Sequence, residues 1–442
     1  MDSPVNYTVM PSGPLCGRLR VPGDKSISHR CIMLGSIATG VTEVSGFLEG
    51  EDSLATLQAF RAMGVRIEGP QQGKVIIHGV GLHGLRSPDK PLYLGNSGTS
   101  MRLLAGLLAG QAFDVELHGD ASLTRRPMKR VTEPLTAMGA QIETGLKVTA
   151  PLRIRGMRSL RGIDYQLPVA SAQVKSCLLL AGLYAQGRTC VTEPAPTRDH
   201  TERMLSGFGY RLERRANTVC LEGGGALTAT RIDVPADISS AAFFMVGASI
   251  TPGSDITLEH VGVNPTRIGV INILRLMGAD IELGNERDIG GEPVADIRVR
   301  ASRLQGIRIP EEQVPLAIDE FPALFVAAAC AEGETVLTGA EELRVKESDR
   351  IAVMATGLQR LGIKATATPD GMLIKGGAMS GATIDSQGDH RIAMAFAMAG
   401  LRAAGSILIN DCANVNTSFP GFVALARAAG LLIESDQADS HV

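Results

Sequence analysis

The sequence predicts an α/β protein of two domains, each made of three copies of one unit of strands and helices. Three observations lead to this prediction. A short phrase ending a helix at Gly recurs six times, an apolar helix rich in small residues recurs between these phrases, and the pattern restarts near the middle of the chain. Six copies of roughly 70 residues account for nearly all of the 442 residues.

The first recurring phrase is an apolar residue, then Gly, then a run that alternates between apolar and polar residues. Gly is the favoured residue just after the end of a helix, and the alternation is typical of a half-buried strand. Each copy is therefore expected to end a helix at this Gly and to begin a strand after it. The glycines are Gly64, Gly139, Gly209, Gly278, Gly362 and Gly430.

The second recurring phrase is an apolar helix rich in small residues. Each copy is followed by a Gly or a turn that contains Gly, and then by a strand-like run such as TEVSGF or SILIND. Because these helices are hydrophobic nearly all round, we expect them to be buried. The predicted helices cover residues 26–38, 97–109, 171–185, 238–250, 319–331 and 389–401.

The pattern restarts in the second half of the chain, where RIDVPADISSA near residue 233 resembles RLRVPGDKSIS near residue 20. We therefore expect a first three-unit domain over residues 22–233. The second domain takes residues 234–442, and residues 1–21 are expected to join it, which makes this domain discontinuous.

Composition excludes several classes of function. The chain has 43 Lys and Arg against 46 Asp and Glu, a formal charge of −3, which argues against a protein that coats nucleic acid. Its longest apolar stretches are too short to cross a bilayer, which needs about 20 residues. The first 14 residues have neither the basic nor the apolar segment of a secretory signal. We expect a cytoplasmic protein.

Cysteine and histidine spacing gives no sign of a metal site. The seven cysteines contain no CxxC pair, so we expect reduced and mostly buried thiols. The eight histidines form neither HxxxH nor HExxH. GVGLHG at residues 79–84 fits GxGxxG but runs into LRSPDKP, which does not open a helix, so a dinucleotide site is not expected.

Polar residues and cations gather at the predicted starts of the apolar helices. A helix N-terminus offers free N–H groups and the positive end of the helix dipole, which suit phosphate and carboxylate. Any one of these residues could be an ordinary cap or a solvated surface charge. Their shared position in the repeats favours instead a cationic pocket for small polyanions. The cations at or near these starts are Lys25, Arg30, Arg102 and Arg391, and the loops before the second helices add Arg125, Arg126, Arg198, Lys346 and Arg350.

Seven motifs, in order, give the chain a specific resemblance. They are PGDKSISHR, LGNSGTSMRLLAG, DASLTRRPMKR, VASAQVKS, LAIDEFPAL, LRVKESDR and GDHRIAMA, and the match runs from about Pro11 to Phe422. Together they resemble the EPSP synthase family of enolpyruvyl transferases. The resemblance implies two domains, each of three βαβαββ units with buried helices around a pseudo-threefold axis, an inside-out α/β barrel. It also implies an active site in the cleft between the domains.

The resemblance also implies a reaction. The enolpyruvyl group of phosphoenolpyruvate is transferred to the 5-hydroxyl of shikimate 3-phosphate by addition and elimination, and phosphate is released. This is a step of the shikimate pathway towards chorismate and the aromatic amino acids. No metal or organic cofactor is implied. Glyphosate is expected as an inhibitor, and we expect a monomer because no exposed apolar stripe is evident.

Site residues follow by matching motifs. Asp319 matches the acid that orients and deprotonates the 5-hydroxyl, Glu347 is the candidate proton donor to the methylene carbon, and Lys25 lies between both substrates. The residues matched to shikimate 3-phosphate are Lys25, Ser26, Arg30, Ser171, Ala172, Gln173, Arg198, Asp319 and Lys346. The residues matched to phosphoenolpyruvate are Lys25, Asn96, Gly98, Arg126, Gln173, Arg350, His390 and Arg391.

The chain departs from the family's pattern at two points. Many members have a second Ser where this chain has Ala172, so a contact there must use the backbone. Some relatives carry a lysine near the last motif, where NVNTSFP has none, which leaves the C-terminal phosphate contact unassigned.

This residue set suits the chemistry. The hydroxyl needs a base and the enol carbon needs an acid, and two carboxylates in different surroundings can divide these roles. Arg and Lys side chains can hold two mutually repelling anions in place.

Two other readings remain to be tested. One is a UDP-N-acetylglucosamine enolpyruvyl transferase, which would carry Asn after the first Lys and a Cys in a mobile loop. Here Ser26 follows Lys25, and DASLTRRPMKR contains no Cys. The other is a catalytically silent homologue that binds anions or another protein. The presence of Lys25, Asp319, Glu347 and Arg126 argues against it.

Overall fold

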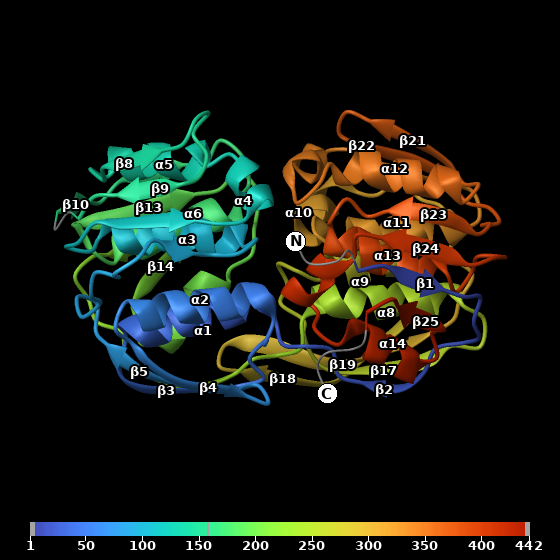
Figure 1. The fold of residues 1–442 in the computed structure, drawn as a ribbon, viewed down its shortest axis with the longest axis horizontal. Coiled ribbons are helices and arrows are strands. Elements are labelled where there is room, and N and C mark those ends of the chain that lie inside the picture. Colours follow the sequence, from blue (N-terminus) through green and yellow to red (C-terminus); the bar gives the residue numbers. More distant parts are fainter. Residues whose placement is uncertain (1–4, 157–158, 438–442) are drawn as a thin grey trace. The chain divides into compact units, whose positions relative to one another are not determined.

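A computed structural model describes residues 5–156 and 159–437, which fall into two units (Figure 1). The N-terminal unit takes Gly23–Val234 together with Asp288–Glu292. The C-terminal unit takes Met1–Pro22, Pro235–Arg287 and Pro293–Val442, as far as these are described. The first four residues of the segment inspected for a secretory signal lie outside the described residues.

The N-terminal unit contains, in its described part, three sheets with one strand order. In each, an edge strand runs parallel to its neighbour, and the other two strands are added antiparallel. The first sheet is β16 (Arg231–Asp233), β3 (Thr39–Ser45), β5 (Lys74–Val80) and β4 (Arg66–Gln71). The second is β6 (Leu92–Tyr93), β7 (Val115–His118), β9 (Leu152–Ile154) and β8 (Ile142–Thr144). The third is β11 (Asp164–Gln166), β13 (Arg188–Thr192), β15 (Thr218–Glu222) and β14 (Leu212–Arg215). A short parallel pair joins β10 (Leu160–Arg161) and β12 (Ala185–Gln186).

The C-terminal unit repeats this arrangement. Its first sheet is β2 (Cys16–Leu19), β17 (Asp255–Gly262), β19 (Glu292–Arg300) and β18 (Asp280–Ile289). Its second is β20 (Glu334–Leu337), β22 (Gly371–Lys375) and β21 (Lys364–Thr368), with a parallel bridge from Arg308 to Val336 in the fourth position. Its third is β23 (Ala382–Asp385), β24 (Ile407–Asn410), β1 (Tyr7–Val9) and β25 (Ile433–Ser435). Strands β1 and β2 show that the N-terminal segment belongs to this unit.

Two kinds of helix alternate with the strands. The apolar helices of the repeat are α1 (Lys25–Ile37), α3 (Gly98–Ala109), α6 (Ala172–Gly182), α8 (Ile238–Ile250), α11 (Phe321–Cys330) and α13 (His390–Ala399). The second helices are α2 (Glu51–Ala62), α5 (Lys129–Ala137), α7 (His200–Gly207), α9 (Gly269–Leu276), α12 (Arg350–Arg360) and α14 (Phe422–Ala429). Short helices are α4 (Ala121–Arg125), α10 (Val314–Ala317) and the 3-10 turns Glu311–Gln313, Glu341–Val345 and Ala413–Thr417.

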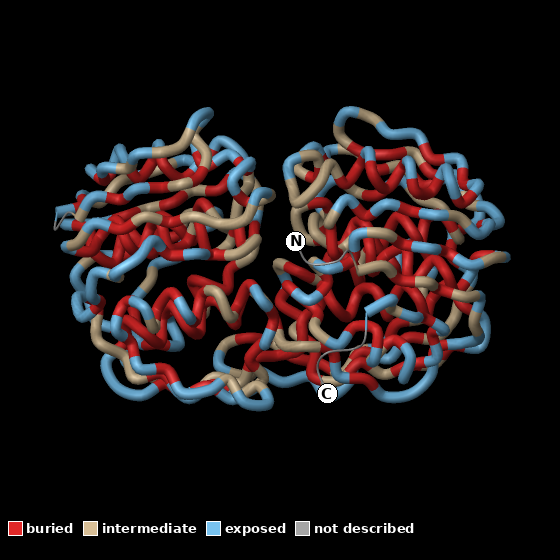
Figure 2. The backbone as a smooth tube through the Cα atoms, in the orientation of Figure 1, coloured by how far each residue is buried: buried red, intermediate tan, exposed pale blue. Residues whose placement is uncertain are grey.

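The apolar helices form the interior of each unit, as predicted. Every residue of α8 is buried, and in α1 every residue after Lys25 is buried. Figure 2 shows these helices as buried segments, with exposed positions gathered on the strands and loops around them. Each unit has its own hydrophobic core, and the core of the C-terminal unit includes Tyr7, Val9 and Leu15 from the N-terminal segment. The inside-out α/β architecture is confirmed.

The glycine that ends each second helix has the predicted conformation. All six have positive φ, from +81° at Gly209 to +116° at Gly430, in the left-handed region where a side chain is strained. A strand follows each one: β4, β8, β14, β18, β21 and β25. Each sequence repeat therefore corresponds to a structural repeat in which a helix ends at Gly and a strand follows.

The tip of the β18–β19 hairpin, Asp288–Glu292, belongs to the N-terminal unit. The Glu292 carboxylate lies 2.7 Å from His200 Nδ1, and Arg203 donates a hydrogen bond to the Gly291 carbonyl at 2.6 Å. Both partners lie on α7. The sequence repeat did not predict that this hairpin tip joins the N-terminal unit, because the repeat marks only where helices and strands begin and end.

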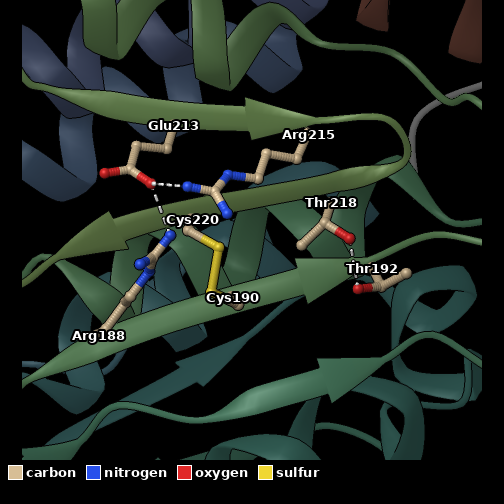
Figure 3. The surroundings of a disulfide bond; sticks show 7 residues. All are labelled: Arg188, Cys190, Thr192, Glu213, Arg215, Thr218 and Cys220. Atoms are coloured by element: carbon tan, nitrogen blue, oxygen red, sulfur yellow. Dashed lines mark hydrogen bonds and ion pairs between the residues drawn. A yellow bond between two sulfur atoms is a disulfide. The ribbon is translucent and has the colours of Figure 1, made fainter.

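The expectation of reduced cysteines is wrong for two of the seven. Cys190 and Cys220 form a disulfide between β13 and β15, with Cα atoms 4.1 Å apart (Figure 3). Thr192 and Thr218, hydrogen-bonded at 2.8 Å, and the ion pair of Arg188 with Glu213 at 2.7 Å lie around it. The two cysteines are direct antiparallel partners, and this register is not visible in the sequence. Five cysteines are free thiols: Cys16, Cys31, Cys177, Cys330 and Cys412.

Two further expectations concern single segments. The GVGLHG segment continues from β5 into turns and extended chain, and no helix opens after it before Gly98. None of the helices formed by residues 5–156 and 159–437 is long and apolar enough to cross a membrane.

Candidate active site

Three buried helices of the N-terminal unit, α1, α3 and α6, begin next to residues predicted to bind anions. The Asp24 carboxylate accepts a hydrogen bond from the Ile27 amide at 2.9 Å and caps α1, and Ser97 caps α3 through the Ser100 amide at 3.1 Å. Ser171 is the N-cap residue of α6, but its side chain makes no capping hydrogen bond. The Ser171 hydroxyl is thus not committed to its own helix, as a ligand-binding group requires.

Lys25 and Ser26 open α1. The Lys25 side chain is one-fifth exposed, and its ammonium forms a close ion pair with the Asp52 carboxylate on α2. Ser26 is buried. The sequence indicated Lys25 but not its acidic partner.

Arg30 lies one turn into α1 and is buried. Its guanidinium donates to three neutral oxygens: Thr201 Oγ1 at 2.7 Å, the Ser26 carbonyl at 2.8 Å and Ser176 Oγ at 3.0 Å. Burial, with a contribution from the charge of Arg198, lowers the pKa of Arg30 to about 10, although Glu202 and Asp24 act in the other direction. Arg198 itself is half-buried, just before α7. Two predicted phosphate-binding cations therefore lie close enough to repel each other.

Asn96, Gly98 and Arg126 form a second group at the start of α3. Arg126 Nη2 donates to Asn96 Oδ1 at 2.5 Å, and Asn96 Nδ2 donates to the Asp120 carboxylate at 2.6 Å. A Cβ on Gly98 would lie 3.0 Å from Arg126 Nη1 and 2.8 Å from Arg102 Nη1. Two guanidinium groups thus lie against the one position in this turn that has no side chain.

Gln173 connects the two groups of the N-terminal unit. Its amide nitrogen donates to Thr99 Oγ1 at 3.2 Å, which ties the first turn of α6 to the first turn of α3. Its Oε1 is buried and accepts no hydrogen bond from any described residue. Ser171, Ala172 and Gln173 are all half-buried. The structure therefore brings the predicted residues of α3 and α6 together.

The C-terminal unit gathers its predicted residues around Arg350, the first residue of α12. This side chain is 1% exposed. Its nitrogens lie 2.9 Å from Asp389 Oδ2, 2.7 Å from Glu347 Oε2 and 3.5 Å from Asp319 Oδ1. A guanidinium offers five N–H donors in a planar fork, so one Arg can hold three carboxylates.

The charges of this cluster stabilise one another. Burial would lower the pKa of Arg350, but Asp389, Glu347 and Asp319 raise it above its ordinary value. Burial would likewise raise the pKa of Asp389, but the Arg350 guanidinium holds it below its ordinary value. Arg350 and Asp389 are therefore both charged at neutral pH.

Asp319 and Glu347, the predicted base and acid, share Arg350 but differ in their other surroundings. The Asp319 carboxylate also lies 3.3 Å from the Lys346 ammonium, and its side chain is 14% exposed. The Glu347 side chain is more exposed, at 23%. Two carboxylates with different neighbours and exposure can have different proton affinities, as acid–base catalysis requires.

Arg391 and His390 begin α13. Arg391 Nη1 donates to the Asp319 carbonyl at 3.0 Å and lies 3.7 Å from the Glu320 carboxylate. The Arg391 amide donates to Asp389 Oδ1 at 3.0 Å. His390 is buried. The structure thus brings Asp319, Lys346, Glu347, Arg350 and Arg391 into one cluster.

The sequence reasoning missed the acids that hold these cations. Asp52, Asp120, Glu320 and Asp389 each contact a predicted site residue. One signal was available: Asp389 in GDHR and Asp24 in GDKS both stand directly before a buried helix, at the position that caps it.

Most of the chain matches one family. The family model for EPSP synthase (3-phosphoshikimate 1-carboxyvinyltransferase) matches residues 9–425. The chain belongs to the EPSP synthase family. A relative from Methylococcus capsulatus with the name 3-phosphoshikimate 1-carboxyvinyltransferase is 71% identical over 98% of this chain and 99% of its own length. A relative of the same name from Alkalilimnicola ehrlichii is 70% identical over 99% of this chain and 98% of its own.

Solved structures of the family share the fold. An EPSP synthase from Acinetobacter baumannii superposes with a TM-score of 0.88, at 61% identity, over 98% of this chain and all of its own. A second structure of EPSP synthase from that organism gives a TM-score of 0.87 at 60% identity. Fold and family predicted from the seven motifs are both confirmed.

Proposed function

We propose that the residue clusters of the two units share the work of the EPSP synthase reaction. The chain transfers the enolpyruvyl group of phosphoenolpyruvate to the 5-hydroxyl of shikimate 3-phosphate, in the shikimate pathway, with release of phosphate. The main support for this division is that the Asp319 and Glu347 carboxylates both contact the buried guanidinium of Arg350.

In this proposal the N-terminal unit binds anionic groups. Shikimate 3-phosphate is held by Ser26, Arg30, Ser171, Gln173 and Arg198, and by the backbone at Ala172. Three features support the assignment: Arg30 is hydrogen-bonded to neutral oxygens, the Ser171 hydroxyl does not cap its helix, and Gln173 Oε1 is buried without a partner among the described residues. Each leaves bonding capacity for a ligand.

Phosphoenolpyruvate is assigned to Asn96, Gly98, Arg126 and Gln173, with Arg350, His390 and Arg391. Gly98 lets a ligand approach Arg126 and the first turn of α3, because no Cβ stands there. Lys25 contacts both substrates, and its ion pair with Asp52 holds the ammonium near the start of α1.

The C-terminal unit supplies acid and base. Asp319 orients the 5-hydroxyl and takes its proton, while Glu347 gives a proton to the methylene carbon, so that the oxygen can bond to the neighbouring carbon. Glu347 then takes a proton back from the resulting methyl group, which restores the double bond as the C–O bond to phosphate breaks, and the proton held by Asp319 leaves with the phosphate. Lys346 and Arg350 stabilise the carboxylate form that Asp319 needs as a base, and the Lys and Arg side chains stabilise the adduct.

Three finer statements are part of the proposal. Glyphosate competes for the phosphoenolpyruvate subsite, the protein acts as a monomer, and the reaction takes place in the cytoplasm. Both substrates are phosphorylated anions, which do not cross a membrane unaided, so the enzyme must work where they are made.

A coupled phosphate-release assay tests the proposal. Phosphate should appear only when phosphoenolpyruvate and shikimate 3-phosphate are both present, and it should still appear after treatment with a metal chelator. Release with UDP-N-acetylglucosamine in place of shikimate 3-phosphate would show the related enolpyruvyl transferase instead. No release with either acceptor, together with thermal protection by shikimate 3-phosphate, would show a silent binding protein.

A further inference from the structure

A lysine is buried in the helix that begins at the proposed shikimate 3-phosphate residues. Lys175 lies on α6, two residues after Gln173, and its amide donates to the carbonyl of Ser171 at 3.1 Å. Its side chain is only 1% exposed. Burying an ammonium group costs free energy unless the group is paired with a negative charge. The partners of Lys175 therefore show which part of the structure it stabilises.

All three partners lie on one segment of chain. Lys175 Nζ is 3.0 Å from Glu193 Oε1 and 2.8 Å from Glu202 Oε1, and it donates to the Thr197 carbonyl at 3.5 Å. These residues span the connection from the end of β13 to the first turn of α7. An ammonium has three N–H donors, so this one segment can take up its full bonding capacity.

A hydrogen bond within the same segment joins Thr197 to Glu193. Thr197 Oγ1 donates to Glu193 Oε2 at 2.5 Å, while Glu193 Oε1 receives Lys175. Both carboxylates are buried, with side-chain exposures of 10% for Glu193 and 3% for Glu202. Thr197 is therefore held through its hydroxyl and through its carbonyl.

A second link joins the same two helices one residue further on. Ser176 follows Lys175 on α6, and Thr201 precedes Glu202 on α7. Thr201 Oγ1 donates to Ser176 Oγ at 2.8 Å, and Arg30 donates to both hydroxyls. The ion pair and the hydroxyl link thus hold α7 against α6 with Arg30 attached.

Arg198 is the residue whose position depends on this arrangement. It follows Thr197 directly, and its charge acts on the guanidinium of Arg30. Because the Thr197 hydroxyl donates to Glu193 and its carbonyl accepts from Lys175, the backbone from which the Arg198 side chain extends is held in place.

We propose that Lys175 is a positioning residue for shikimate 3-phosphate, whose ammonium fixes the segment from Glu193 to Glu202 so that Arg198 and Arg30 face one phosphate together. The inference rests on the proposed function, because it assigns Arg198 and Arg30 to that substrate. Lys175 does not touch the substrate itself, since its donors are taken up by the segment.

A lysine that only stabilises the fold gives a different result from a positioning residue. Loss of stability alone lowers the melting temperature and affects both substrates equally. Loss of positioning weakens shikimate 3-phosphate selectively, because the phosphoenolpyruvate group is held from another segment: Arg126 donates to Asn96, and Asn96 donates to Asp120.

The test compares Lys175→Met with Leu179→Ala by titration calorimetry and steady-state kinetics. Leu179 is fully buried one turn further along α6, so its truncation is a matched destabilising change. We expect Lys175→Met to weaken shikimate 3-phosphate by roughly tenfold or more, with the KM for phosphoenolpyruvate changed less than about threefold. Leu179→Ala should lower the melting temperature and leave the ratio of the two KM values unchanged. Equal changes in both KM values for Lys175→Met, or none, would overturn the proposal.

Two further variants keep the test decisive if Lys175→Met does not fold. Thr197→Val removes only the hydroxyl that binds Glu193, and a smaller but still selective loss of shikimate 3-phosphate affinity is expected. Lys175→Arg keeps the charge and should restore part of that affinity. Unchanged affinity in Thr197→Val would contradict the proposal. If the wild-type enzyme released no phosphate from the two substrates, the proposed function would fail instead, so the two failures are distinct.

Discussion

Both units place an arginine near the start of a helix, yet the two arginines have opposite surroundings. Arg30 on α1 is hydrogen-bonded to hydroxyl and carbonyl oxygens, and the pKa of its guanidinium is lowered by burial to about 10. Arg350 on α12 is ion-paired to three carboxylates, which raise the pKa of its guanidinium. Both arginine side chains are buried. Arg30 keeps a positive charge beside neutral oxygens, whereas Arg350 binds carboxylates.

The difference shows how one repeated architecture can serve two tasks. A guanidinium bonded to neutral oxygens keeps its charge available for an anionic ligand. A guanidinium that binds several carboxyl groups holds them in a set geometry, where they can exchange protons with a substrate. The proposed function accordingly gives the N-terminal unit a binding role and the C-terminal unit the acid–base chemistry, together with the phosphoenolpyruvate contacts of Arg350, His390 and Arg391.

The largest effect is expected at the two carboxylates. Asp319→Asn and Glu347→Gln should each lower kcat by on the order of 10²–10⁴-fold, because each removes a proton-transfer group and leaves the shape of the side chain. The KM values should change far less. Steady-state assays of both variants check this, and near-normal turnover in both would end the assignment of acid–base chemistry to the C-terminal unit.

The binding task of the N-terminal unit can be divided by two substitutions. Arg126→Ala should weaken phosphoenolpyruvate by roughly 10–100-fold, because it removes charge-assisted hydrogen bonds. Ser171→Ala removes one hydroxyl and should weaken shikimate 3-phosphate by a smaller factor. Each variant is titrated with each ligand. Equal losses for both ligands would show that the two groups of residues are not separate subsites.

A smaller and more selective effect is expected at Gly98. The added methyl of Gly98→Ala would lie 3.0 Å from Arg126 Nη1 and 2.8 Å from Arg102 Nη1, so these guanidinium groups must shift. We expect glyphosate, the larger ligand, to lose roughly tenfold in affinity and phosphoenolpyruvate to lose less. Inhibition curves at matched phosphoenolpyruvate saturation measure the change. An unchanged inhibition constant would mean that Gly98 does not line the pocket.

The smallest effect concerns stability in acid. Because Arg350 holds the pKa of Asp389 below its ordinary value, ionised Asp389 stabilises the fold at neutral pH. This contribution is present above the unfolded pKa, about 4, and is lost as the pH falls through the lower folded value. Asp389→Asn keeps an acceptor for the Arg391 amide, so α13 stays capped.

Melting temperatures between pH 3 and pH 7 test this prediction. The variant should be less stable than the wild type at pH 7. The difference in melting temperature should narrow below about pH 4, where this carboxyl takes up a proton more readily in the unfolded chain than in the folded protein. Parallel curves would show that Asp389 is not held as an ion by Arg350.

Much of the fold could be predicted because the repeat is marked by backbone chemistry. Gly64 and its five counterparts end helices through positive φ, which is a local requirement that a sequence displays directly. The buried helices were equally visible, since they are apolar on all sides. The Cys190–Cys220 disulfide was not visible, because it depends on which residues of β13 and β15 stand opposite each other.

For the candidate site, the sequence indicated residues but not the partners that hold them. Motifs identified the residues that match the family, such as Asp319 and Arg350. They did not show that Lys25 is paired with Asp52, or that Lys175 is buried between Glu193 and Glu202. Pairing of this kind depends on the packing of α6 against α7 and of α1 against α2, and neither is encoded in spacing along the chain.

The position of β1 has a consequence for the order in which the protein is completed during translation. Tyr7–Val9 lies between β24 and β25, whose last residue is Ser435, so this strand must wait for almost the entire chain before it can pair. The N-terminal unit needs no strand beyond β16, which ends at Asp233, although Asp288–Glu292 joins it later. That unit can therefore begin to fold on the ribosome while the earlier residues remain unpaired. A deletion that removes Tyr7–Val9 accordingly damages the unit that is synthesised last, the one that carries Asp319 and Glu347.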